Sequence, residues 1–128
     1  LVRLRQVLIV RLRDKFCSWA VRPAHASMFG SAARGDGDTS SDIDIFIVQP
    51  PDSEVGDDWT LQLDDLARSV KAWTGNNAGI ADLTEQQVAK MIFDRAPILA
   101  ELERDAVHLC GLPIRTVLSE AGTWAQGE

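Results

Sequence analysis

The chain has 128 residues, which is enough for one domain with its own hydrophobic core. Hydrophobic residues make up 45% of it, yet no apolar stretch approaches the ~20 residues of a membrane span, which excludes a membrane-spanning protein. The net charge of −6 excludes a chain whose whole surface grips nucleic acid. Arginines interrupt the first apolar residues, unlike in a secretory signal, and we expect a cytoplasmic protein.

The first predicted element is a helix over residues 1–20, because apolar residues recur there at spacings of three and four. Pro23 ends it, since the residue before a proline is pushed out of the helical region. A short apolar run over residues 24–29 predicts a strand. Residues 30–41 are rich in Gly, Ser, Thr and Asp and predict a turn, and the β-branched run 43–48 predicts a second strand.

The rest of the chain alternates between helix-like and strand-like patterns. In chain order, these patterns predict a helix over 59–73, a strand over 78–83, helices over 84–93 and 97–104, a strand over 107–110 and a helix over 113–120. Thr84 and Gln87 have the spacing of a capping box, which supports a helix start there. We expect one α/β (α+β) domain over residues 1–120, with a small mixed sheet flanked by helices, and a loose tail over 121–128.

The chain contains two cysteines and two histidines, the residue types that most often bind metals or act as nucleophiles and bases. Cys17 and Cys110 show no metal-type spacing and are expected to be two buried thiols. His25 is expected to be a packing or edge residue, and His108, in an apolar run, a core histidine with its hydrogen bonds satisfied.

Basic side chains are concentrated at the start of the chain. Residues 1–22 hold one acidic group, Asp14, and six basic ones: Arg3, Arg5, Arg11, Arg13, Lys15 and Arg22. Two interpretations stay open: a solvated helix face, or a surface that faces a phosphate-bearing partner.

The predicted turn after the first strand carries groups suited to phosphate. Gly30 has no Cβ and allows close approach of the backbone to another group. If a short helix begins near Ser31, its first residues offer free N–H groups and a hydroxyl. Arg34 adds a fork of donors that matches phosphate oxygens. An ordinary turn remains the alternative.

Two carboxylates follow at the start of the second predicted strand. Asp42 and Asp44 lie on one face of a strand, ~6.6 Å apart along it. Their charges repel, and Mg²⁺ resolves this because it accepts a few carboxylates while bridging to substrate phosphates. Two such ions ~3.5–4 Å apart would assist in-line attack on phosphorus. A turn-and-cap arrangement facing water is the alternative.

Residues 30–45 as a whole resemble the signature of the polymerase-β-like nucleotidyltransferases, most closely the minimal nucleotidyltransferases. That signature is Gly-Ser-x-Ala-Arg-Gly, a short spacer, then Ser-Asp-x-Asp and an aliphatic residue. Its elements here are Gly30, Ser31, Ala33, Arg34, Gly35, Ser41, Asp42, Asp44 and Ile45. The resemblance implies a mixed sheet flanked by helices and transfer of a nucleotidyl group from an NTP to a hydroxyl or phosphate acceptor.

The resemblance also implies roles for single residues. Gly30 and Ser31 would contact the triphosphate, and Asp42 and Asp44 would be catalytic residues that hold Mg²⁺. We expect Arg34 and Ser41 to join the nucleotide-binding set.

A third carboxylate of the family, on a later strand, is not evident in this chain. Its expected position within residues 78–83 is Gly79, which has no side chain to offer. Asp82 would substitute only in a different register, because an offset of three places a side chain on the opposite face. Asp82 is therefore a questioned catalytic residue, and loss of a general base costs ~10²–10⁴ in rate.

Two functions follow as alternatives. The first is an enzyme that uses one or two Mg²⁺ ions and an NTP, ATP foremost, to modify a small molecule, a protein side chain or an RNA end. The second is a nucleotide-binding regulatory or antitoxin-type module with weak or no catalysis. The resemblance implies that such a module works with a helical partner protein or through the DNA contacts of a further domain. The start at Leu1 rather than Met, the basic residues 1–22 and the lack of a carboxylate at Gly79 favour this second alternative.

Overall fold

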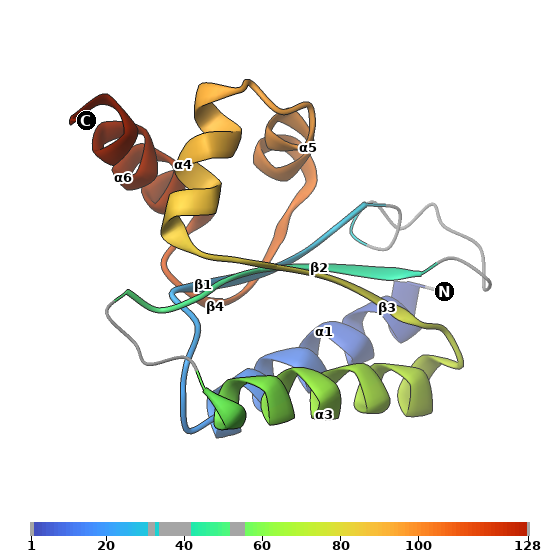
Figure 1. Ribbon diagram of the computed structural model, residues 1–128. Coiled ribbons are helices and arrows are strands. Elements are labelled where there is room, and N and C mark those ends of the chain that lie inside the picture. The colour runs from blue at the N-terminus through green and yellow to red at the C-terminus, as the bar shows by residue number, and fades with distance from the viewer. Residues whose placement is uncertain (1, 31–32, 34–41, 52–55, 128) are drawn as a thin grey trace.

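The computed structural model describes residues 2–30, 33, 42–51 and 56–127. Its four strands form one mixed sheet with helices on both faces, which confirms the expected α+β architecture (Figure 1). The strands are β1 (His25–Phe29), β2 (Ile43–Val48), β3 (Ala78–Leu83) and β4 (Val107–Gly111). The described helices are α1 (Val2–Ser18), α3 (Asp57–Thr74), α4 (Glu85–Phe93), α5 (Ile98–Asp105) and α6 (Ile114–Gly127).

The strand order across the sheet is β3-β2-β1-β4. Strand β1 runs antiparallel to both β2 and β4, whereas β2 and β3 are parallel and are joined through α3. Parallel neighbours need such a crossover, since a tight hairpin can connect only antiparallel strands. Strands β1 and β2 are central in the sheet, and most of their side chains are buried on both faces.

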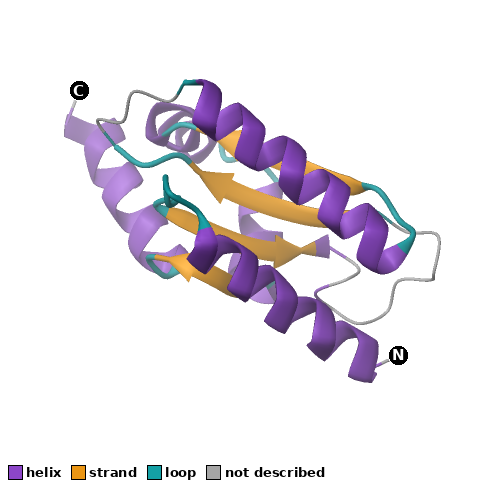
Figure 2. Ribbon diagram, turned by 90° about the horizontal axis from the view of Figure 1, so that it is seen from below, coloured by secondary structure: helices purple, strands orange, loops and turns teal. Residues whose placement is uncertain are grey.

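Helices α1 and α3 lie side by side across one face of the sheet (Figure 2). The core on this side contains Leu12, Phe16 and Leu66 from the helices, all fully buried, and alternate residues of β2. Because side chains alternate along a strand, Ile45 and Ile47 belong to this core.

Helices α4, α5 and α6 cover the opposite face (Figure 1). Here Phe46 and Val48 of β2 pack with Val88 of α4, Leu102 of α5 and Val117 of α6. Strand β2 is thus apolar on both sides, which explains why its sequence reads as a continuous β-branched run.

Helix α6 is longer than its sequence pattern predicts. It continues to Gly127, through residues expected to form a loose tail. Ala121 is 6% exposed and packs in the same core as Val117, one helical turn earlier. Burial of this residue gives the chain a reason to remain helical past the predicted end at residue 120.

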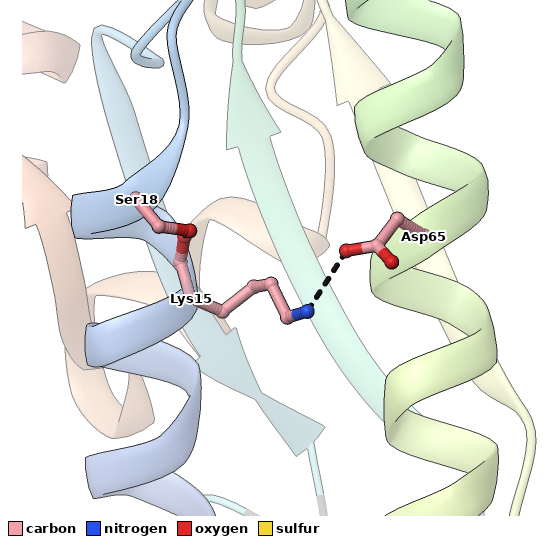
Figure 3. Close-up of polar contacts among 3 residues, drawn as sticks. All are labelled: Lys15, Ser18 and Asp65. Atoms are coloured by element: carbon pink, nitrogen blue, oxygen red, sulfur yellow. Dashed lines mark hydrogen bonds and ion pairs between the residues drawn. The ribbon is translucent and has the colours of Figure 1, made fainter.

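A partly buried ion pair links the two helices of the first face. Lys15 Nζ of α1 lies 2.8 Å from Asp65 Oδ2 of α3, while the Ser18 hydroxyl donates to the Lys15 carbonyl oxygen (Figure 3). The Lys15 ammonium and the Arg11 guanidinium also lie over the Trp73 ring, 5.7 and 5.6 Å from its centroid. Cationic side chains of α1 therefore fasten it to α3.

Other basic residues of this region also make intramolecular contacts. Arg13 donates from Nε and Nη2 to the His108 carbonyl oxygen on β4, and Arg22 donates to the Cys17 carbonyl oxygen. Arg5 makes a similar pair of bonds to the Ala33 carbonyl oxygen. Several donors of these basic side chains are therefore used in contacts within the chain. Neither a solvated helix face nor a surface for a phosphate-bearing partner predicts such contacts.

Local sequence signals explain where two elements begin and end. The capping box at α4 is confirmed: the Thr84 hydroxyl accepts from the Gln87 backbone N–H, and the Gln87 side chain accepts from the Thr84 N–H. At the end of α3, Gly75 adopts φ of 79°, the left-handed conformation that glycine tolerates best.

Three expectations about single residues are wrong. Cys17 is exposed on α1 and Cys110 is only partly buried, so neither is a core thiol. His108 is exposed on edge strand β4, where its Nε2 donates to the Gly111 carbonyl oxygen at 2.7 Å. It is His25 that is fully buried, as expected of a packing residue.

Within the described segments, no helix has the length and apolar character to cross a membrane.

Candidate functional site

The carboxylate of Asp44 lies between two glycines. In the sheet register Asp44 pairs with Phe29 of β1 on one side and with Gly79 of β3 on the other. A Cβ atom at Gly79 would lie 2.8 Å from Asp44 Oδ1, and one at Gly30 would overlap Asp44 Oδ2. The absence of both Cβ atoms creates the space in which this side chain sits.

Gly30 has a second reason to be glycine. It follows β1 directly, is buried, and has φ of +71°, in the left-handed region that other residues rarely adopt. The backbone of Gly30 therefore turns out of the strand while it lies against the Asp44 carboxylate.

Burial raises the pKa of Asp44 above its usual range, and the nearby carboxylates of Asp42 and Glu101 raise it further. Negative charge thus accumulates around a half-buried carboxylate, an arrangement that a cation would stabilise. Glu101 comes from the first turn of α5 and was missed by sequence reasoning. An acid in the first turn of a helix is too common to single out, so only the fold reveals its position.

Asp42 precedes β2 and is exposed. Its separation of two residues from Asp44 places it on the same side of the extended chain. The Ile43 N–H donates to the Asn77 carbonyl oxygen at 2.9 Å, which fixes this end of β2 beside the start of β3.

The donor set at this end of β2 fits a magnesium ion. Asp42 and Asp44 offer hard carboxylate oxygens, the ligands that Mg²⁺ takes alongside water and phosphate oxygens. Groups of three or more His, Cys, Asp and Glu side chains that would hold a metal are absent from the described segments. A metal on the Asp42–Asp44 pair would therefore take its other ligands from water, a bound phosphate or residues outside those segments.

The structure does not bring Asp82 to the other two aspartates. Asp82 pairs in register with Ile47, whose side chain faces α1 and α3, the sheet face opposite to Asp44. Its carboxylate accepts hydrogen bonds of 3.2 and 3.3 Å from Trp59 Nε1 and likewise from Gln49 Nε2. The offset of three from Gly79 accounts for this placement.

The remaining predicted site residues, Ser31, Arg34 and Ser41, lie outside the described residues. Ala33, within the same signature, is described. Its side chain is 5% exposed in the core of the first face, and its carbonyl oxygen accepts two hydrogen bonds from Arg5 of α1. Sequence reasoning counted Arg5 only as part of a basic cluster, because nothing local connects residues this far apart in the chain.

Comparison with known proteins gives a family and a fold. Residues 9–114 match the profile of a family described as nucleotidyltransferase domain. Two similar solved structures are mutants of the toxin–antitoxin pair MntA–HpeT. One has a TM-score of 0.54 at 13% identity and covers 94% of this chain and 86% of its own. The other has a TM-score of 0.52 at 14% identity, with coverage of 95% and 86%. No curated protein matches the sequence.

Proposed function

The chain belongs to the nucleotidyltransferase domain family, and from this premise we propose that it transfers a nucleotidyl group from an NTP, ATP foremost, in a Mg²⁺-dependent reaction. One observation carries the proposal. The Asp44 carboxylate is seated between Gly30 and Gly79, with Asp42 beside it, directly next to the segment predicted to bind phosphate.

In this proposal each residue has a defined task. Asp42 and Asp44 bind the metal, while Gly30, Ser31, Arg34 and Ser41 bind the nucleotide and its phosphates. Mg²⁺, when bound, neutralises charge on the triphosphate and on the departing pyrophosphate. The acceptor oxygen forms a bond to the α-phosphorus, the bond from that phosphorus to pyrophosphate breaks, and the acceptor proton leaves to solvent or a base.

A second candidate is an antitoxin-type module that binds nucleotide and acts with a helical partner protein. Gly79 favours it, because this position pairs with Asp44 and yet has no carboxylate to serve as base or ligand. The fold similarity to a protein of the MntA–HpeT toxin–antitoxin pair suggests that the partner is the other member of such a pair. The two candidates share nucleotide binding and differ in turnover.

The first test is binding of each NTP in the presence and absence of Mg²⁺. The double variant Asp42→Asn/Asp44→Asn is expected to lose the Mg²⁺-dependent part of the affinity, tenfold or more, because its two anionic ligands become neutral. A matched control is Asp57→Asn/Asp58→Asn, which removes the same charge from an exposed acidic pair at the start of α3. Equal affinity in the wild type and the site variant would show that the metal site is misassigned.

The second test separates the two candidates. NTP labelled at the α-phosphate is incubated with the protein, Mg²⁺ and candidate acceptors, and both pyrophosphate and labelled acceptor are measured. Label transfer that the site variant loses supports the enzyme. Tight Mg²⁺-dependent binding without pyrophosphate release supports the module.

A further inference from the structure

Arg5 of α1 is hydrogen-bonded to the segment that carries the predicted phosphate-binding residues. Its Nε and Nη2 donate to the Ala33 carbonyl oxygen at 3.2 and 2.7 Å. Ala33 is two residues after Ser31 and directly before Arg34 in the sequence. A helix far from this segment along the chain is therefore tied to its backbone.

Three features restrain the chain at Gly30 and Ala33. Gly30 leaves β1 with a left-handed φ of +71°, against the Asp44 carboxylate. The Ala33 side chain is buried in the hydrophobic core between the sheet and α1. Arg5 then holds the Ala33 carbonyl oxygen with two donors of one guanidinium group, and hydrogen bonds from a cation are stronger than those between neutral groups.

We propose that Arg5 is a positioning residue for the triphosphate seat. It acts through the Ala33 carbonyl, holding Ala33 in place after the Gly30 turn that lies against the Asp44 carboxylate. This inference rests on the proposed function. The physical reason is preorganisation: a backbone already fixed in its binding conformation does not lose that freedom again when the ligand binds.

The chain offers a matched control in the same helix. Arg13 also donates from Nε and Nη2 to one main-chain carbonyl oxygen, that of His108, at 3.1 and 2.8 Å. His108 lies on β4, which β1 separates from the β2 strand of Asp44. Loss of Arg13 removes the same charge and the same kind of tether, but at edge strand β4.

The test measures dissociation constants for Mg²⁺ with α,β-methylene-ATP, whose bridging carbon blocks release of pyrophosphate. For Arg5→Met we expect affinity about tenfold weaker than for the wild type, and for Arg13→Met a change of less than about twofold. Thermal unfolding of both variants reports whether they are folded and comparably destabilised. Equal losses of affinity in the two variants would overturn the positioning role.

A conservative variant separates the geometry of Arg5 from its charge. Arg5→Lys keeps the positive charge but not the planar fork that supplies Nε and Nη2 together. The proposal expects its affinity to be closer to that of Arg5→Met than to that of the wild type. Wild-type affinity in Arg5→Lys would mean that charge alone matters, and it would refute the inference.

Hydrogen exchange of the free protein keeps the result independent of the proposed function. In peptides that contain Gly30 and Ala33, amide exchange is expected to be faster in Arg5→Met than in the wild type, and unchanged in Arg13→Met. If the wild type fails to bind the nucleotide analogue, the proposed function fails. Exchange that is identical in all three proteins overturns the role of Arg5 in any case.

Discussion

Asp44 of β2 and Gly79 of β3 are register partners, and the Oδ1 atom of Asp44 occupies space that a Cβ at residue 79 would contest at 2.8 Å. The position at which related nucleotidyltransferases are expected to have a third carboxylate therefore adjoins the proposed metal site. The atom that a Cβ at residue 79 would crowd is the end of the Asp44 side chain, so rotation of that side chain can make room without a shift of the backbone.

We predict that Gly79→Asp turns over NTP faster than Gly79→Asn. Both variants crowd Asp44 equally, and only the first adds an anionic group that can bind a second ion or accept the acceptor's proton. The expected difference in the rate of pyrophosphate release is about tenfold, which is smaller than the ~10²–10⁴ contribution of a well-placed general base. Added Mg²⁺ should raise the thermal stability of Gly79→Asp more than that of Gly79→Asn. Equal rates in the two variants would show that residue 79 is not a catalytic position of this fold.

Asp82 is predicted to stabilise the fold without contributing to nucleotide binding. Its carboxylate accepts from the indole N–H of Trp59, a side chain that is 2% exposed. Asp82→Ala leaves that buried donor without an acceptor and should lower the free energy of unfolding by about 1–3 kcal/mol. Asp82→Asn keeps an acceptor oxygen and should cost less. Weaker affinity for Mg²⁺ and NTP at unchanged stability would instead make Asp82 a site residue.

The strands at residues 43–48 and 78–83 were predictable to the residue because local patterns determine them. A β-branched run ended by prolines has few alternatives to a strand, and Asn77 and Thr84 supply a turn and a cap at the two ends of β3. The spacing of Gly79 and Asp82 was equally informative, since the period of two in a strand already placed them on opposite faces.

Contacts between distant segments were not predictable in this way. The bond from Arg5 to Ala33 depends on how α1 packs against the sheet, and the position of Glu101 near Asp44 depends on α5 lying over the opposite face. The exposure of His108 follows from β4 being an edge strand, which no local pattern reveals. Residues with the same local sequence could be core or surface until the order of the strands is known.

The ion pair between Lys15 and Asp65 is predicted to stabilise the docking of α1 on α3. The two side chains are 22% and 49% exposed, and Lys15 also lies near the Trp73 ring. A double-mutant cycle with Lys15→Met and Asp65→Asn should give a coupling free energy of about 0.5–1 kcal/mol, which falls as salt is added.

The pair Lys90–Asp94 is the control for that cycle. It has a similar contact of 2.7 Å but lies within α4, with Lys90 75% exposed. Its coupling should be smaller, about 0.3 kcal/mol. Coupling in the α1–α3 pair no greater than in this control would mean that the contact does not help to fasten the two helices.

The buried histidine of β1 is predicted to make the fold less stable as the solution becomes mildly acidic. The Leu112 carbonyl oxygen lies 2.6 Å from His25 Nδ1 and can only accept, so Nδ1 carries the proton. Nε2 of the neutral ring then accepts from the Ser27 hydroxyl at 3.0 Å. A second ring proton would reverse this bond, because Nε2–H would then donate to the hydroxyl oxygen, and the main cost of protonation is the burial of a positive charge.

Burial lowers the pKa of His25 below its ordinary value of 6.5, the Leu112 carbonyl partly offsets this, and His108 lowers it further. Between pH 6.5 and the folded-state pKa of His25, the unfolded chain binds more protons than the folded one. The contribution of neutral His25 to the free energy of unfolding is therefore fully present above pH 6.5 and decreases below it. The slope from one such group is at most ~1.4 kcal/mol per pH unit. The pKa of Asp44 is raised from 3.8 by its burial, so protonation of this carboxyl favours the folded state and opposes the loss of stability from His25 as the pH falls.

Urea unfolding between pH 7.5 and 5.5 checks this prediction in the wild type, His25→Gln and His108→Gln. Most of the loss of stability on acidification should persist in His108→Gln, because burial, the main cause of the lowered pKa of His25, is retained there, and the loss should shrink in His25→Gln. If His25→Gln does not fold, the NMR titration of the His25 ring in the wild type gives the same answer through its midpoint, expected below pH 6.5. A midpoint at or above that value would contradict the prediction, because the buried ring would then hold its charge as readily as in the unfolded chain.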